Sequence, residues 1–444
     1  MRERPASGVP ASGVPASEAV AGGDVASARR GRPTLAGWAR YAGLGYATVV
    51  LIVGTSLPTP LYLLYERAFG MSPLDVTLLV AVYSAAVIVA LLSCGPLSDA
   101  VGYRLVLTCG LIVAAGGAAL LAAASSALWL VAGRGVQGLA VGAATGALTA
   151  GMVLTEPNGR PERASVLASA ATTAGCGIGP VLAGALAQFA GRPRVLCYLV
   201  EIVLLVPAIG VAATLPRALG VTGQRWSLRR PRVPESIRRP FIIPAAVSCI
   251  AWSIAYVVLT LVPSYAAASL GRSNLLIEGG ASGSLLLCAA AVQVLLRSWQ
   301  ARRAQAVGLS LLVIGVLGLI AAGALGSAAV LFATIAIAGA GQGVGFMGSL
   351  RRLSEIAPAA QRAETVSMFY VVTYIGGGVS TVGVGLLATR LTLTASVQVF
   401  AAVFAAFALM TLGALLAGRN GAGRDIPVSD EASAEKGGNG EGCR

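Results

Sequence analysis

Two ionisable side chains lie well inside the apolar stretches of this 444-residue sequence, and both could do chemistry there. Arg134 belongs to the segment GRGVQGLAVG and precedes Gln137 by three residues, so a helix places the guanidinium and the amide on one face. A charge within a membrane span is costly and usually faces a water-filled cavity or a partner. Arg134 is therefore a candidate for a polar site, and structural pairing with a carbonyl or a carboxylate is the alternative.

Glu201 is the one carboxylate well inside such a stretch. A buried carboxyl at this position could carry a proton. It lies within two turns of the expected outer face, however, where it could extend toward water or pair with Arg192 or Arg194. The sequence favours this second interpretation.

Metal and cofactor chemistry has little support in the composition. The sequence has no histidine, which removes the commonest metal ligand and the commonest proton shuttle near neutral pH. Its seven cysteines occur singly and form no CxxC pair, which is typical of packed free thiols. No phosphate-binding loop offers a site for ATP. We expect no cofactor, no metal and no enzyme activity, since a membrane-embedded enzyme needs a catalytic cluster at one depth.

The elements that position these residues follow from the composition. Hydrophobic residues make up 56% of the chain and charged residues 11%, against about 25% charged in soluble domains, which excludes a soluble enzyme and a disordered protein. Apolar runs of about 20 residues, long enough to cross a bilayer, recur twelve times. We place them at 42–65, 75–98, 104–126, 128–152, 163–190, 195–215, 241–266, 274–297, 304–324, 327–350, 363–388 and 393–417.

The arginines orient these spans. The formal net charge of +14 would by itself suggest a nucleic-acid partner. If the N-terminus is cytoplasmic, however, 26 of the 32 basic residues lie in cytoplasmic segments, 5 in outer loops, and Arg134 within a span. This bias predicts a multi-pass protein of the plasma membrane with both termini cytoplasmic, whose excess charge lies beside anionic lipids and not on nucleic acid.

The two halves of the chain resemble each other. Segments 163–187 and 362–388 align at an offset of 199, which pairs Arg163 with Arg362 and Gly184 with Gly383, although chance matching of glycine-rich helices is the alternative. Such a repeat predicts an all-α membrane protein with twelve transmembrane helices in two six-helix bundles, related by a pseudo-twofold axis along the membrane normal, with a site between them. The predicted units are a disordered N-tail (1–41), an N-terminal bundle (42–215), a basic linker (216–240), a C-terminal bundle (241–417) and a disordered C-tail (418–444).

The segment GPLSDAVGYR at 95–104 resembles the G-x-L-x-D-x-x-G-x-[RK] loop signature of the major facilitator superfamily. The matching residues are Gly95, Leu97, Asp99, Gly102 and Arg104. The resemblance implies that Asp99 latches the two halves together on the cytoplasmic side. Ala100 and Tyr103 replace two basic residues of the usual pattern, and an ordinary polar turn is the alternative interpretation.

Two further segments resemble signatures of the same superfamily. Arg134, Gln137, Gly138 and Gly142 match R-x-x-Q-G-x-x-x-G, and the resemblance links this arginine to substrate binding or proton coupling. The second half has Gly339 in the corresponding place, so Arg134 has no twin. The segment GCGIGPVLAG is similar to an antiporter motif and suggests export and a smooth face toward the opposite bundle, through Gly175, Gly179, Pro180 and Gly184.

The resemblance implies a central cavity lined by the first, fourth, seventh and tenth spans, with contributions from the second, fifth, eighth and eleventh. In TSLPTPLY (55–62), two prolines either bend the first span so that its hydroxyls face this cavity or serve packing alone. We expect lining by Arg134, Gln137, Thr59, Tyr62, Tyr83, Thr173, Trp252, Tyr256, Gln293, Gln342, Phe346, Tyr370 and Tyr374.

Such a cavity suits a neutral or anionic amphipathic molecule. The expected function is secondary active transport by a monomer in the lipid bilayer, as proton-coupled antiport that exports a drug-like compound or secondary metabolite. The expected partners are therefore this small molecule, protons and lipid. Proton-coupled uptake of a metabolite is the first alternative. A non-transporting receptor or scaffold is the alternative of another class.

Overall fold

The computed structural model describes residues 35–216, 233, 235–270, 275–325, 327–357 and 362–417. Twelve of its helices are long and apolar enough to cross a membrane, as the sequence predicts. The predicted tail residues 1–34 and 418–444 and most of the predicted linker lie outside the described residues. The all-α prediction is confirmed, since helices and turns account for the regular structure of the described chain.

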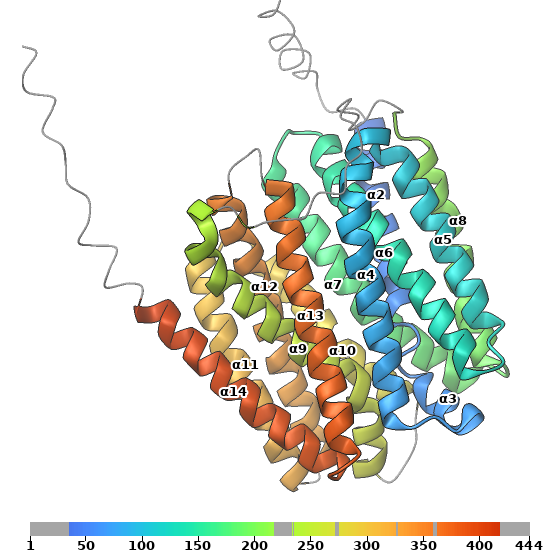
Figure 1. Cartoon of the computed structure of the whole chain (residues 1–444), viewed down its shortest axis with the longest axis vertical. Helices are drawn as coiled ribbons and strands as arrows, with labels where there is room; N and C mark the ends of the chain where they lie inside the picture. Colours follow the sequence, from blue (N-terminus) through green and yellow to red (C-terminus); the bar gives the residue numbers. More distant parts are fainter. Residues whose placement is uncertain are drawn as a thin grey trace, which may run out of the picture.

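The N-terminal half forms one bundle, drawn in blue to green in Figure 1. Its helices are α2 (Leu35–Ser56), α3 (Tyr62–Phe69), α4 (Pro73–Val101), α5 (Tyr103–Ala122), α6 (Ala127–Thr155), α7 (Pro161–Phe189) and α8 (Pro193–Ala213). We call the end of the molecule at which α2 begins the terminal face. The end at which α3 lies is the opposite face.

The C-terminal half forms the second bundle, drawn in yellow-green to red in Figure 1. A short 3-10 helix, η1 (Glu235–Ile237), precedes it. Its helices are α9 (Arg238–Leu270), α10 (Leu275–Leu295), α11 (Ala301–Leu325), α12 (Ala328–Ile356), α13 (Arg362–Ala388) and α14 (Leu393–Ala417).

The first span differs from the predicted continuous run at 42–65. It begins earlier, at Leu35, and breaks after Ser56, so that α3 starts only at Tyr62. Pro58 and Pro60 lie in the intervening turn. Proline lacks a backbone N–H and its ring clashes with the preceding helical turn, which explains why the helix ends here.

The ends of α4 are encoded locally. Ser72 accepts a hydrogen bond from the Asp75 amide at 3.2 Å, and the Asp75 carboxylate accepts one from the Ser72 amide at 2.8 Å, which forms a capping box. At the other end, Gly102 has φ 92°, a conformation that glycine adopts without strain. Gly102 thereby lets the chain turn directly from α4 into α5.

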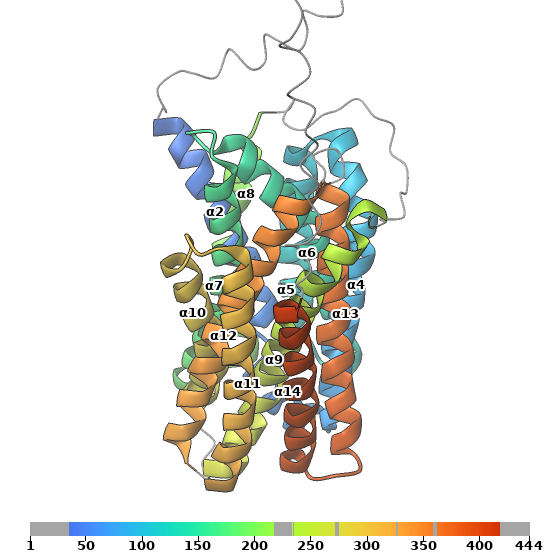
Figure 2. The ribbon, with the colours of Figure 1, turned by 90° about the vertical axis from the view of Figure 1, so that its left-hand side faces the viewer.

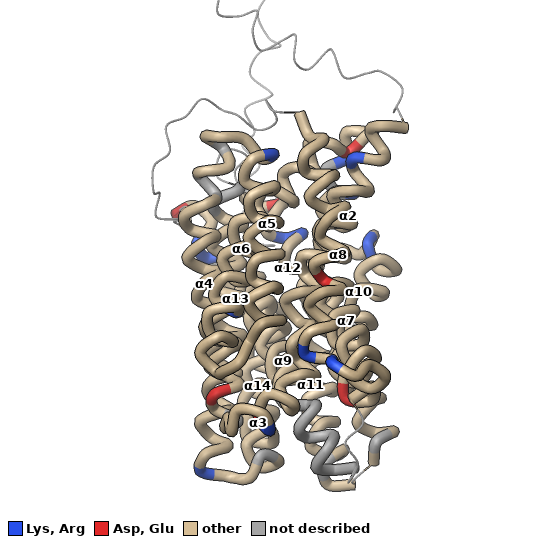
Figure 3. The backbone as a smooth tube through the Cα atoms, turned by 90° about the vertical axis from the view of Figure 1, so that its right-hand side faces the viewer, with Lys and Arg blue, Asp and Glu red and all other residues tan. Residues whose placement is uncertain are grey.

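The two bundles meet along two helix pairs, α7 with α10 and α4 with α13. Figure 1 shows α4 and α13 side by side at the boundary between the halves, and Figure 2 shows the helices of both bundles running along one direction. Charged residues are sparse along the tube in Figure 3. Val203, Val379 and Met410 are each 67% exposed, as expected of side chains that face lipid. The molecule is a multi-pass membrane protein.

Candidate functional site

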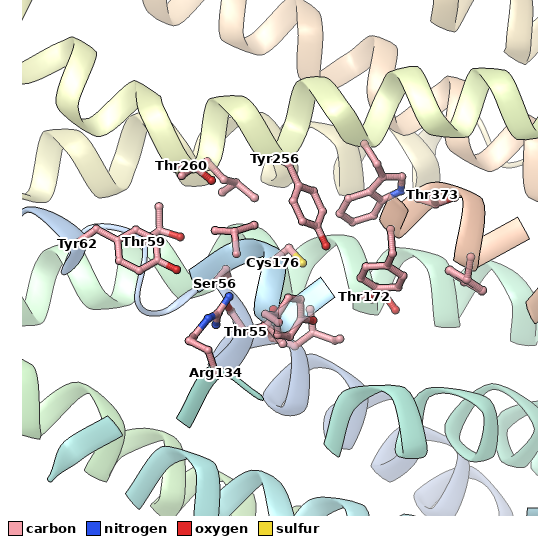
Figure 4. A pocket seen from close by; sticks show the side chains of 17 residues that line it. Thr55, Ser56, Thr59, Tyr62, Arg134, Thr172, Cys176, Tyr256, Thr260 and Thr373 are labelled. Carbon is pink, nitrogen blue, oxygen red and sulfur yellow. The ribbon is translucent and has the colours of Figure 1, made fainter. Parts of the chain in front are cut away.

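A cavity lies between the bundles, with walls from α2, α3, α4, α6 and α7 on one side and α9 and α13 on the other. Eight of the predicted residues line it: Thr59, Tyr62, Tyr83, Arg134, Trp252, Tyr256, Tyr370 and Tyr374. The sequence-based list missed Ile52, Val80, Thr172, Cys176, Leu259, Thr260 and Thr373; it also omitted Thr55 and Ser56, whose hydroxyls the TSLPTPLY segment had indicated. Figure 4 shows hydroxyl groups from both bundles around this space.

An aromatic cluster forms much of the wall. Tyr374 has its ring centroid 6.4 Å from that of Tyr83 and 6.5 Å from that of Tyr256, so that it joins the two bundles. Trp252 continues the cluster, 6.1 Å from Tyr256 and 5.6 Å from Phe346. Edge-to-face contacts at these distances are favourable and hold the rings at fixed angles. The cluster therefore offers apolar ring faces together with phenolic hydroxyls.

Arg134 contributes a guanidinium group to the cavity wall. Its Nη1 donates to the Thr55 carbonyl at 2.7 Å and to Oε1 of Gln137 at 3.0 Å, and the group lies 4.5 Å from the ring centre of Tyr83. Gln137 in turn donates from Nε2 to the Gly54 carbonyl at 3.2 Å. Figure 4 shows Arg134 directed toward Thr55 and Ser56. Arg134 thus both pairs with a carbonyl, which was the alternative interpretation of its sequence position, and lines the cavity.

The two carbonyls are available because α2 breaks. An α-helix would bond the Gly54 carbonyl to the amide of residue 58, but that residue is proline and has no N–H. The Thr55 carbonyl would accept from the Thr59 amide, which instead bonds to the Ser56 carbonyl at 3.1 Å. Arg134 and Gln137 therefore replace the helical partners that the TSLPTPLY segment removes.

Glu201 of α8 lies next to this group. Its side chain is 2% exposed, and Oε1 packs against the Cα of Gly54 so closely that any Cβ there would overlap it. The Gln137 side chain is within hydrogen-bonding reach of the carboxyl, and the Arg134 charge acts on it. The other oxygen, Oε2, is buried and has no hydrogen-bond partner among the described residues.

The interpretation that the sequence favours for Glu201, extension toward water or pairing with an arginine, is wrong. The side chain neither extends toward water nor pairs with Arg192 or Arg194; the Arg194 guanidinium instead lies 5.9 Å from the ring centre of Phe69. The ion pairs found in the described part of the chain do not include Glu201. The reason is the glycine on α2, which opens space for a carboxyl on the bundle side of α8.

Five predicted lining residues do not line the cavity. Gln137 is bonded to the lining residue Arg134 but is not itself part of the wall. Thr173 is fully buried and its neighbour Thr172 takes the lining position, because successive helical residues point about 100° apart. Gln342 and Phe346 of α12 are buried, and Phe346 belongs to the aromatic cluster through its contact with Trp252. The amide of Gln342 has no hydrogen-bond partner in the described structure.

Gln293 bridges the two bundles. Ser169 of α7 donates to Oε1 of Gln293 at 2.7 Å, and Nε2 of Gln293 donates to the Thr173 hydroxyl at 3.1 Å. Both ends of the amide are therefore satisfied by α7. The site lies near the end of α10 at the terminal face and ties that part of α10 to α7.

The loop segment at 95–104 is described in part. Arg104 donates to the Leu215 carbonyl at 3.3 Å, just after the end of α8, and this bond links α5 to α8 within one bundle. Leu97 is half-buried, whereas the side chain of Asp99 lies outside the described residues. The latch expected of Asp99 therefore stays a prediction.

The glycines of α7 serve two different contacts. Cβ atoms built on Gly175 and Gly179 would lie 2.7 and 2.6 Å from backbone oxygens of α2, within the same bundle. A Cβ on Gly184 would lie 2.5 Å from a carbonyl of α10, in the other bundle, and the Pro180 carbonyl also faces α10. The expected smooth face toward the opposite bundle is thus confined to part of the motif. Gly138 of α6 allows a similar approach, since a Cβ built there would lie 2.5 Å from the Tyr83 carbonyl of α4.

Comparisons with known proteins agree with this architecture. The chain resembles two crystal structures of a bacterial homolog of the human lysosomal transporter Spinster, one inward-facing and unoccupied, the other inward-facing and occupied. The sequence identity is 16% in both cases, and the TM-scores are 0.65 and 0.66. Each match covers 86% of this chain, and the two matches cover 98% and 96% of the other chains. No curated protein sequence matches the chain. The Major Facilitator Superfamily model matches residues 44–381, so the chain belongs to this superfamily of transporters.

Proposed function

We propose that this transporter exports an amphipathic organic molecule, a drug-like compound or a secondary metabolite, in exchange for protons. The observation that carries the proposal is the cavity wall, in which aromatic rings and hydroxyls surround the guanidinium of Arg134. Aromatic faces bind flat apolar groups, and a guanidinium binds an acceptor or an anionic group. The wall therefore favours a neutral or anionic ligand over a polyvalent cation.

Binding of such a molecule requires the bundles to move. The cavity measures about 70 Å³, whereas sites for drug-sized ligands measure about 300–1,000 Å³. Because the wall is shared between the two halves, rocking of one bundle against the other enlarges it. The small residues of α7 and α10 at the bundle contact allow the two helices to slide on each other.

The orientation follows from the arginine distribution. We place the terminal face and both tails in the cytoplasm and the opposite face outside, in the plasma membrane. Protons then enter from the opposite face as the organic molecule leaves. Export is preferred to uptake because the Gly175–Gly184 segment is similar to an antiporter motif. Both walls of the cavity come from one chain, which fits a monomeric transporter.

The test is transport in everted membrane vesicles that contain the full chain. A panel of fluorescent amphipathic dyes, anionic, neutral and cationic, is supplied outside, and the proton gradient is generated by respiration. Export predicts energy-dependent accumulation of neutral or anionic dyes that collapses with an uncoupler, and Arg134→Ala should abolish it. Loss of preloaded dye on energisation would instead indicate uptake. Absence of any gradient-driven movement, with full biological activity kept in Asp99→Asn and Arg134→Ala, would overturn the proposal in favour of a receptor.

A further inference from the structure

The carboxyl of Glu201 is buried inside the N-terminal bundle, although it is not part of the cavity wall. It is 2% exposed, it lies about 12 Å along α8 from Pro193, and its Oε2 has no hydrogen-bond partner in the part of the chain that the structure describes. A buried carboxylate without full pairing is energetically costly, whereas a carboxylic acid in the same place is tolerated. The geometry of this site thus suits a group that gains and loses a proton.

The position of the carboxyl is built into α2. Gly54 leaves a notch that Oε1 fills, and an alanine at that position would displace the carboxyl. The same residue offers its carbonyl to Gln137, so the carboxyl lies beside the network of the broken helix. Glu201 is consequently held against Gly54 and away from lipid, beside the network that includes the lining residue Arg134.

Arg134 has competing partners. Its Nη1 is shared between the Thr55 carbonyl and the Gln137 amide oxygen, while its Nε is buried and has no partner among the residues described. A charged carboxylate attracts a guanidinium more strongly than a neutral carbonyl does. If Glu201 loses its proton, the Arg134 guanidinium is therefore attracted toward the Glu201 carboxylate on α8.

We propose that Glu201 is the proton-carrying residue of this transporter, and that its deprotonation draws Arg134 away from the Thr55 carbonyl and so alters the cavity wall. In this step the O–H bond of the acid breaks, the proton passes to water, and the electron pair stays on the carboxylate. Reprotonation from water reverses it. The inference rests on the proposed proton coupling and names the residue that provides it.

The titratable groups around Glu201 are weaker candidates for the proton carrier. The helices packed against α8 are α2, α5 and α7, and α7 contributes Cys176, which lines the cavity. Other titratable or charged groups on the helices around α8 make bonds of their own: Tyr46 of α2 to the Leu204 carbonyl at 2.9 Å, Arg104 of α5 to the Leu215 carbonyl at 3.3 Å, and Tyr65 of α3 to the Tyr198 hydroxyl at 3.1 Å.

A direct test needs no substrate. Infrared difference spectra of the full chain in lipid nanodiscs, recorded while the pH is raised, report the loss of protonated carboxylic acids. We expect a buried carboxylic C=O band that titrates in the wild type, is missing in Glu201→Gln and is shifted in Gly54→Ala. Glu278→Gln is the matched control, because it removes another buried carboxyl without partners in the described structure. Glu278→Gln should remove a different band and leave that of Glu201 in place. If every titrating band of the wild type survives Glu201→Gln, the proposal is overturned.

The dye assay in everted vesicles separates this inference from the proposed function. We expect Glu201→Gln to lose gradient-driven accumulation while it still exchanges dye across the membrane without a gradient, and Glu201→Asp to recover part of the driven transport. Undiminished driven transport in Glu201→Gln would refute the role of Glu201 and leave the proposed function intact. If the wild type shows no driven transport, the proposed function fails, and the infrared titration still decides whether Glu201 binds the proton.

Discussion

Gln137 donates from Nε2 to the carbonyl of Gly54 at 3.2 Å, and that carbonyl has no helical donor because residue 58 is proline. Arg134 does the same for the Thr55 carbonyl. Two segments 79 or more residues apart in sequence are therefore complementary: one breaks a helix and the other satisfies the exposed backbone. Pairing of the freed carbonyls keeps the break stable inside a membrane.

The first prediction concerns Gln137 and Pro58. Gln137→Leu leaves the Gly54 carbonyl buried without a donor, which should lower the free energy of unfolding by about 1–3 kcal/mol. In a Pro58→Ala background the restored N–H can bond to that carbonyl, so the same substitution should cost less. The measurement is a double-mutant cycle of thermal unfolding in detergent. An equal loss in both backgrounds would show that the proline does not create the need for Gln137.

The second prediction concerns the close approach of the bundles. A Cβ at Gly184 would lie 2.5 Å from the Leu275 carbonyl of α10, and backbone cannot move aside as a side chain can. Gly184→Ala should therefore hold α7 and α10 apart toward the opposite face. Distances between spin labels on these two helices should increase relative to the wild type.

The repeat supplies the matched control for this substitution. Gly383 is the counterpart of Gly184 at the offset of 199 residues, and a Cβ there would meet no atom of the described residues within 4 Å. Gly383→Ala should leave the α7–α10 distances unchanged. The argument fails if both variants widen the gap, or if neither does.

The fold was predictable from the sequence to a large extent, because twelve apolar runs of sufficient length leave few alternatives in a bilayer. The break after Ser56 was only partly predictable. Two prolines in TSLPTPLY indicated a bend, but a hydropathy run continues through them, so the predicted span 42–65 joined α2 to α3.

The site was predictable in its residue types and less so in its details. Arg134 and the tyrosines stand out from an apolar background, whereas Thr172 and Thr173 cannot be told apart without the rotation of α7 about its axis. The sequence mispredicts the orientation of Glu201 because it shows the distance of this residue from the outer face but not the glycine against which its carboxyl packs. Only the packing of α8 on α2 reveals the notch at Gly54.

The third prediction concerns pH and Glu66 of α3, which lies outside the twelve candidate spans. Partial burial raises the pKa of the Glu66 carboxyl, an effect that the neighbouring Arg67 partly offsets. A raised pKa in the folded state means that stability is present at low pH and is lost as the pH rises through that value. The Tm of Glu66→Gln should therefore exceed that of the wild type at about pH 8 and match it more closely at about pH 4. A constant difference at both pH values would contradict the assignment.

The last prediction concerns the link between the bundles at Gln293. Gln293→Leu removes its bonds to Ser169 and Thr173, so α7 and α10 should separate more readily near the terminal face. In a variant that keeps Cys176 as its only cysteine, maleimide should then label this lining residue several times faster. Gln305→Leu is the control: it removes a buried amide of similar size whose bond to Ser349, at 3.2 Å, stays within one bundle. That substitution should lower stability by about 0.5–1.5 kcal/mol without changing the labelling rate. Equal labelling in the two variants would mean that Gln293 serves packing and does not hold the bundles together.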